Sequence, residues 1–237
     1  MSPWPREPLA LGLDAGALAA AGAVVANADS AWSLGNLSLA LAAARERHPG
    51  ARAARLLLAP DLCRHFVLTP PGGLRAFNEL RGVAAARAAQ IFGDGTWAVV
   101  ADWSLNQPFA CAALPQALLS ALLDASREAG LVLGLESAVL AALSLAAPAP
   151  GFVAFATPAH VVLAHADRGG TDVLRCLRRP AGDAGDSPQA FAAREAAREG
   201  LRTGSTAPAP QWLEPLAVMA QDNEALWASR LAAKGGR

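Results

Sequence analysis

The chain has 237 residues and a mass of 24.2 kDa, which is enough for one sizeable core or two small lobes. Its 20 basic and 20 acidic residues give a formal net charge of +0, so charge supports neither nucleic-acid binding nor attraction to an anionic membrane. Tyrosine is absent, and the three cysteines and four histidines lack the spacing of a zinc site, so we expect no metal centre.

The first 30 residues are apolar and rich in small side chains. We predict a strand over residues 9–13, a tight turn at Asp14 and Gly16, and a returning strand over 17–25, with a further turn at 27–29. The same stretch also has features of a secretory leader, because Arg6 precedes it and an Ala-Asn-Ala tripeptide ends it. Asp14 inside the apolar run argues against a leader, and an exported binding module stays an alternative.

Residues 36–95 alternate between helix and strand patterns. We predict a helix over 36–47 capped by Asn36, then a strand over 55–59 that pairs with a strand over 63–68. A proline-rich loop leads to a long helix over 74–92, where Glu79 is expected to be a solvated charge. The predicted inward residues are Leu37, Leu41 and Ala44 on the first helix and Leu80, Val83, Ala84, Arg87 and Ile91 on the second.

The stretch over 96–145 organises the chain. It predicts a strand over 97–103, a turn at 106–108, a return strand over 109–114, and a helix that starts at Pro115 and ends at Gly130. A short apolar segment over 131–135 is typical of a buried strand, and Glu136 and Ser137 are expected to open another helix. The apolar positions of the two helices are Leu118, Leu119, Leu122, Leu123, Val139, Leu140 and Leu143.

The last third predicts three strands followed by helices. Strands over 151–156, 160–166 and 171–177 form a meander, because a glycine-rich turn separates the second from the third. A charged helix follows over 189–202, with Phe191, Ala192 and Ala196 as its apolar side. A flexible spacer over 203–210 and a final helix over 213–231 complete the prediction.

These elements resemble those of a known superfamily. A helix that ends in Ala-Gly-Leu at 129–131, a short apolar strand, Glu136 and an Ala/Leu helix resemble the actin-like ATPases. More narrowly, the chain looks like the branch that includes PilM, the cytoplasmic domain of GspL, and MshI. The resemblance implies an α/β fold with mixed sheets, actin-like and related to ribonuclease H, in two lobes. The first would span 1–147 with an inserted subdomain at about 36–95, and the second, shortened lobe would span 148–237.

The resemblance also locates two degenerate phosphate-binding turns. Asp14 and Gly16 match the Asp-x-Gly triplet of the first turn, whose N–H groups hold phosphate in active members, but the Thr or Ser that usually follows is Ala17. The second turn, at 156–159, has neither acid nor glycine, and Pro158 lacks an N–H. We therefore expect no ATP hydrolysis, no required cofactor, no metal and no catalytic residue, with Asp14 and Gly16 as the only nucleotide-binding candidates.

The function implied by the resemblance is scaffolding in a type IV pilus or type II secretion assembly platform. Such domains sit at the cytoplasmic face of the inner membrane, and this chain, which lacks the membrane helix of GspL and MshI, is expected to be peripheral to the membrane without inserting into it, as PilM is. They hold the short cytoplasmic tail of a single-pass membrane protein, or the assembly ATPase. The sequence does not identify the partner-binding residues. The alternative is an actin-like ATPase or sugar-kinase-like enzyme with Asp14 beside the metal and Asp102 as general base.

Overall fold

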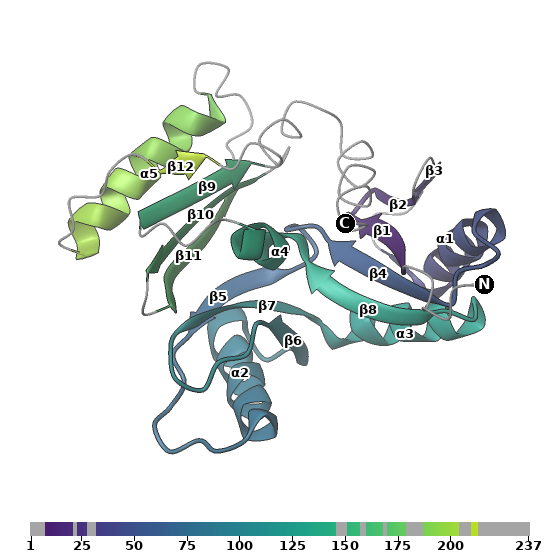
Figure 1. Cartoon of the computed structure of the whole chain (residues 1–237), viewed down its shortest axis with the longest axis horizontal. Coiled ribbons are helices and arrows are strands. Elements are labelled where there is room, and N and C mark those ends of the chain that lie inside the picture. Colours follow the sequence, from purple (N-terminus) through teal and green to yellow (C-terminus); the bar gives the residue numbers. More distant parts are fainter. Residues whose placement is uncertain are drawn as a thin grey trace, which may run out of the picture.

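The computed structural model describes most of the chain, in eight segments. These are residues 8–20, 23–27, 32–145, 151–156, 160–167, 170–178, 187–203 and 210–212. Three sheets, each accompanied by helices, make up the described part (Figure 1). The mixed α/β class expected from the sequence is confirmed.

The five-stranded sheet has the order β3-β2-β1-β4-β8. Its centre is a parallel pair in which Leu11 of β1 lies opposite Leu56 of β4, and both side chains are fully buried. The predicted return strand over 17–25 is instead two strands that pair with each other as a hairpin. The strands are β1 (Leu9–Leu13), β2 (Ala17–Ala20), β3 (Ala23–Ala26), β4 (Ala53–Leu58) and β8 (Val132–Ser137). The N-terminal segment with features of a secretory leader therefore supplies strands β1, β2 and β3 of this sheet.

Strand β8 lies at the edge of this sheet, which corrects the prediction of a buried strand. Val132 keeps 74% of its surface exposed, and within the described residues β8 pairs only with β4. The strand also continues through Glu136 and Ser137, which were expected to open the next helix. An uninterrupted apolar run cannot distinguish a central strand from an edge strand, because both are rich in the same residues.

Three helices border the five-stranded sheet: α1 (Leu34–Arg47), α3 (Gln116–Glu128) and α4 (Ala138–Leu145). Helix α1 packs against α3, and its buried side includes the predicted Leu37, Leu41 and Ala44. Its cap is Ser33 rather than Asn36, because the Ser33 hydroxyl accepts the Asn36 N–H at 3.2 Å. In α3, Leu122 is fully buried as predicted, whereas Leu123 is 39% exposed.

The three-stranded sheet has the order β5-β7-β6. Its elements are β5 (Arg64–Leu68), β6 (Trp97–Ala101), β7 (Phe109–Pro115) and α2 (Phe77–Phe92). The predicted pairing of β5 with β4 is wrong, since β1 and β8 already occupy both edges of β4. Strand β5 pairs with β7 instead, whereas the predicted β6–β7 hairpin is confirmed. Helix α2 starts three residues later than expected and turns Leu80, Ala84 and Ala88 inward, leaving Arg87 and Ile91 exposed.

The four-stranded sheet contains the predicted meander in the order β11-β10-β9-β12, with α5 against it (Figure 1). The elements are β9 (Gly151–Ala156), β10 (His160–Asp167), β11 (Gly170–Arg178), α5 (Pro188–Thr203) and β12 (Gln211–Trp212). Ala192 and Ala196 of α5 are buried as predicted, and β12 was not anticipated. The helix expected over 213–231 lies outside the described residues.

One large core joins the five-stranded and four-stranded sheets. It runs from Leu11 and Leu56 through Leu122 to Phe155 and Val162. Helix α1 and strand β4, which the sequence assigns to an insertion at 36–95, contribute to this core. Two smaller cores are separate from it: one belongs to α2 and the three-stranded sheet, and the other to α5 and the four-stranded sheet. The boundary between lobes at 147/148 stays a prediction.

Candidate functional site

The turn between β1 and β2 is closed by the side chain of Asp14. This residue is only 3% exposed, and its Oδ1 accepts the N–H groups of Gly16 at 2.8 Å and Ala17 at 2.7 Å. The Asp14 N–H donates in turn to the Ala17 carbonyl at 3.0 Å. An Asp side chain that bonds backbone two or three residues ahead is a common way to stabilise a tight turn. Asp14 and Gly16 thus lie in the same turn, and the hydrogen bonds of the Asp14 side chain stabilise that turn.

A second carboxylate accepts a hydrogen bond from the remaining backbone N–H group of this turn. Asp61, in the loop after β4, accepts the Ala15 N–H at 3.1 Å. The turn's carbonyl groups are bonded as well, since Trp32 Nε1 donates to the Asp14 carbonyl at 2.6 Å and the Asn27 N–H donates to the Gly16 carbonyl at 2.7 Å. The three successive N–H groups at positions 15–17 therefore all point to carboxylates of the same chain.

This arrangement does not fit a phosphate. A phosphate-binding turn needs several N–H groups directed at the anion and a positive local field. Here those N–H groups donate to Asp14 and Asp61, and the two carboxylates would repel a polyphosphate. The second degenerate turn contributes Ala156 at the end of β9, and its residues 157–159 lie outside the described part of the chain.

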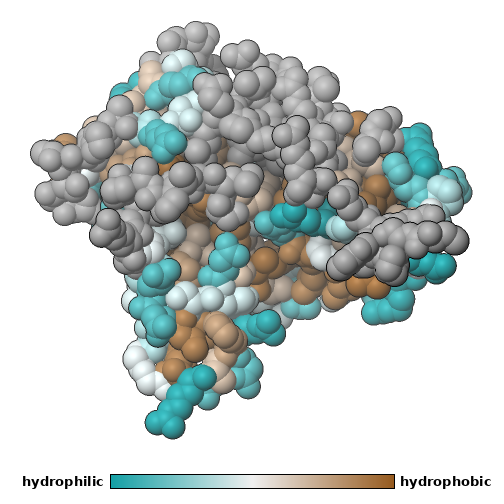
Figure 2. Space-filling model, in the orientation of Figure 1, coloured by the Kyte–Doolittle hydropathy of each residue, from teal (hydrophilic) through white to brown (hydrophobic). Residues whose placement is uncertain are grey.

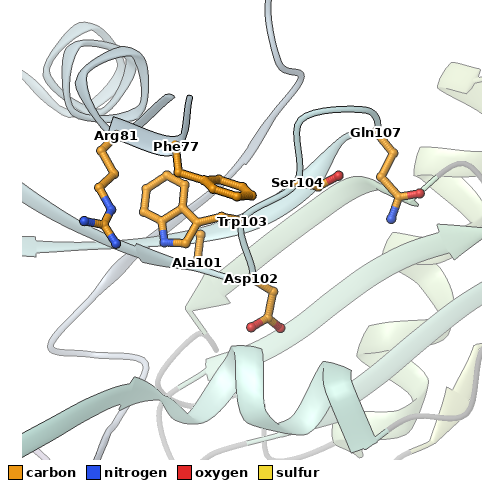
Figure 3. A pocket seen from close by; sticks show the side chains of 7 residues that line it. All are labelled: Phe77, Arg81, Ala101, Asp102, Trp103, Ser104 and Gln107. Atoms are coloured by element: carbon orange, nitrogen blue, oxygen red, sulfur yellow. The ribbon is translucent and has the colours of Figure 1, made fainter. Parts of the chain in front are cut away.

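Asp102, the candidate general base, follows β6 and lies apart from this turn. It is exposed and lines two neighbouring pockets, neither of which includes Asp14. Its carboxylate points toward α4 and away from the rings of Phe77 and Trp103 (Figure 3). The two acids that the enzyme alternative requires are thus in different sheets and different surroundings.

The pocket on the α4 side of Asp102 is a groove between two sheet edges. Its volume is about 320 Å³, and strand β6 forms one wall and strand β8 the other. Within the described residues, β6 pairs only with β7 and β8 only with β4, so each strand has one edge without a strand partner. We call this pocket the edge groove. Its lining residues are Arg55, Val100, Ala101, Asp102, Gly134, Leu135, Glu136 and Leu140.

The edge groove is lined by both apolar and charged residues, and two of the charged residues form an ion pair. Arg55 on β4 donates from Nε to the Glu136 carboxylate on β8 at 2.6 Å, and both side chains remain partly exposed. Hydrophobic residues gather over β8 on the same face of the molecule (Figure 2). Sequence reasoning missed the groove because its two walls are about 30 residues apart and belong to different sheets. The residue that could have pointed to the groove was Asp102, but the sequence suggested it only as a candidate general base.

The histidine and cysteines near the centre of the molecule do not form a reactive site. His65 Nε2 lies 3.0 Å from the Ser137 hydroxyl, and burial lowers the pKa of His65 to about 4, with smaller effects from His160 and Arg64. Burial raises the pKa of the Cys63 thiol to about 12, so it stays protonated. Among the described residues, no group of three or more His, Cys, Asp or Glu side chains could hold a metal ion.

Comparisons with solved structures identify the fold. A Bacteroides thetaiotaomicron protein described as having an actin-like ATPase fold and unknown function matches with a TM-score of 0.51 and 8% identity, over 85% of this chain and 79% of that one. This chain has the actin-like fold. The fold class inferred from the sequence is therefore confirmed.

Two further similar structures come from bacterial assembly machines. The PilM-PilN type IV pilus biogenesis complex matches with a TM-score of 0.49 and 17% identity, over 74% of this chain and 62% of that one. The cytoplasmic domain of EpsL, an inner-membrane component of the type II secretion system of Vibrio cholerae, matches with a TM-score of 0.45 and 14% identity, over 73% of this chain and 71% of that one. No family model and no curated protein matches the sequence. None of the described helices is both long and apolar enough to cross a membrane.

Proposed function

We propose that this chain is a non-catalytic actin-like scaffold of a type IV pilus or type II secretion assembly platform. It holds the short cytoplasmic tail of a single-pass inner-membrane protein, or a segment of the assembly ATPase, at the cytoplasmic face of the inner membrane. The proposal joins the family resemblance of the sequence to one observation in the structure. That observation is the edge groove, which lies between two strands that each have one edge without a strand partner among the described residues.

An extended peptide fits such a groove for a simple reason. The edge of a strand carries main-chain N–H and C=O groups that can bond an added strand, and alternate side chains then enter pockets beside it. Leu135 and Leu140 provide apolar contacts, and Asp102 with the Arg55–Glu136 pair provides polar ones. A micromolar affinity is sufficient, since confinement to the membrane raises the effective concentration of the tail.

The absence of catalysis is the second part of the proposal. The bonds from the N–H groups at 15–17 to Asp14 and Asp61 support it, because they leave no cradle for the phosphates of Mg-ATP. We expect no measurable hydrolysis. Calorimetry that detected micromolar Mg-ATP binding, lost in Asp14→Ala, would contradict this part and favour the enzyme alternative.

The partner can be tested by recovery and titration. The full chain is used to isolate partners from native cells, and the cytoplasmic tail of each recovered membrane protein is synthesised and titrated by calorimetry. Asp102→Arg, which fills the edge groove and reverses its charge, should weaken tail binding by about tenfold or more, equivalent to about 1.4 kcal/mol. Asp94→Arg, at another exposed acid, is the matched control and should bind as the unmodified protein does. If no pilus or secretion component is recovered and the protein turns over a phosphorylated small molecule, the enzyme function replaces this one.

A further inference from the structure

A second depression lies beside the edge groove, on the other side of Asp102. Its volume is about 730 Å³, and it is open to solvent between the first turns of α2 and the segment that follows β6 (Figure 3). We call it the aromatic pocket. Its lining residues are Phe77, Arg81, Ala101, Asp102, Trp103, Ser104 and Gln107. The proposed function makes no use of it.

Two aromatic rings form the apolar part of this pocket. Phe77, at the start of α2, keeps 49% of its surface exposed. The Trp103 ring stands edge-on to the buried Phe109 ring, with the centroids 5.9 Å apart, so it is held by the small core beneath it. A Trp fixed from below and an exposed Phe at its side give an anchoring surface whose shape is largely set before anything binds.

Arg81 supplies a positive charge at the same place. Its Cζ lies 5.7 Å from the centroid of the Trp103 ring, within the range of a cation–π contact. Arg55 and Arg127 each pair with a carboxylate, whereas no carboxylate of the described residues lies in an ion pair with Arg81. The acid next to the pocket, Asp102, directs its carboxylate to the opposite side (Figure 3). The N–H groups of Arg81 are thus available to an external acid.

We propose that the aromatic pocket is a docking surface for an acidic segment of a partner protein that carries an aromatic or large aliphatic side chain beside its carboxylate. The carboxylate takes the fork of N–H donors on Arg81, and the apolar side chain rests on Phe77 and Trp103. Charge complementarity favours an acidic segment, because none of the ion pairs among the described residues involves Arg81, and the carboxylate of Asp102 points away from it (Figure 3). Arg, Trp and Phe close together are also the composition that carries most of the energy in protein interfaces. This surface adjoins the edge groove and shares Ala101 and Asp102 with it.

The test is a titration followed by nitrogen-15 NMR of the full chain. The probes are a capped hexapeptide Gly-Asp-Glu-Phe-Leu-Gly, the same peptide with two lysines in place of the two acids, and inorganic phosphate. The Trp103 indole signal, assigned by its loss in Trp103→Phe, and the Arg81 Nε–H signal report on the pocket. The acidic peptide should shift both signals to saturation, whereas the lysine peptide and phosphate should not.

Three variants separate the contributions. Arg81→Glu should weaken the acidic peptide by about tenfold or more, since a charge-assisted bond is replaced by a repulsion. Phe77→Ala should also weaken it without changing the fold. The control is Arg87→Glu, an exposed arginine of the same helix outside the pocket, which should bind normally. The proposal fails if the acidic peptide gives no saturable shift, if the lysine peptide binds equally well, if phosphate alone reproduces the shifts, or if Arg87→Glu and Arg81→Glu act alike.

Discussion

The β1–β2 turn and the edge groove use their main-chain groups in opposite ways. At the turn, the three N–H groups at 15–17 donate to Asp14 and Asp61, and the turn's carbonyl groups accept bonds from Trp32 and Asn27. At the groove, β6 and β8 each have one strand neighbour among the described residues. The N–H groups of the turn are thus bonded within the chain, whereas the proposed function assigns the free strand edges at the groove to a segment of a partner.

Under the proposed function, this difference means that the actin-like fold takes a peptide at the groove in place of a nucleotide at the turn. A turn that binds phosphate needs its donors unoccupied, and two acids are enough to occupy them. A sheet edge that accepts a peptide needs free main-chain groups and neighbouring side chains of suitable shape, which Leu135 and the Arg55–Glu136 pair would supply here. The following predictions test whether the two regions are as different as their bonding indicates.

The largest effect is expected at α3, which packs against strands of both sheets that wall the groove. Leu122 is fully buried there, so Leu122→Ala should lower the free energy of unfolding by about 2–5 kcal/mol. Arg127→Ala is the control, because its side chain is exposed and pairs with Asp124 on the same helix, and it should change stability by less than about 0.5 kcal/mol. Equal urea midpoints for the two variants would reject this assignment of faces.

The next effect concerns Asp14, which closes the turn. Asp14→Ala removes an ionised acceptor of two backbone N–H groups and should cost about 1.5–3 kcal/mol in the free energy of unfolding. Asp14→Asn keeps an oxygen acceptor and should cost less. Urea unfolding measures both. A stability unchanged in Asp14→Ala would mean that the carboxylate serves a ligand rather than the fold.

A smaller effect is expected where the β10–β11 hairpin meets the loop beside the groove. A Cβ at Gly170 would lie 2.1 Å from the Pro108 carbonyl oxygen, and Gly170 has a φ of +106°. Gly170→Ala should therefore destabilise by about 1–3 kcal/mol. Gly82→Ala, on the exposed side of α2 with nothing within 4 Å of the added carbon, should stabilise by about 0.5–1 kcal/mol. Thermal unfolding that moved both variants in the same direction would contradict the packing described for this hairpin.

The smallest effect is a pH dependence at His65. Its pKa is lowered to about 4 in the folded chain from an ordinary value of 6.5, so between these values the unfolded chain binds more protons. Stability should therefore fall as the pH falls from 6.5 to about 4. Burial lowers the pKa of His160 as well, in the same direction. His65→Gln should flatten the slope without abolishing it, and an unchanged slope in urea melts across this range would rule out a buried neutral His65.

Local pattern predicted most elements but not how they combine. The β6–β7 hairpin and the β9–β10–β11 meander could be inferred because their partners are adjacent in sequence and joined by turn residues. The partner of β5 could not, because β7 lies about 45 residues further on and only the occupied edges of β4 exclude the nearer choice. The hydrogen bonding of the turn at Asp14 could not be inferred from the sequence either, because the second carboxylate of that turn comes from Asp61, which is distant in sequence. The edge position of β8 follows from the order of the strands in the sheet, and the apolar sequence of β8 does not indicate it.

Hydrogen–deuterium exchange tests the contrast between the two regions most directly. The full chain is labelled alone, with the tail peptide of a recovered membrane partner, and with Mg-ATP. We predict that the peptide slows amide exchange in β8 (Val132–Ser137) and β6 (Trp97–Ala101), and that Mg-ATP changes nothing at residues 14–17. Slower exchange at residues 14–17 with Mg-ATP, together with unchanged exchange in β6 and β8 at saturating peptide, would contradict the account.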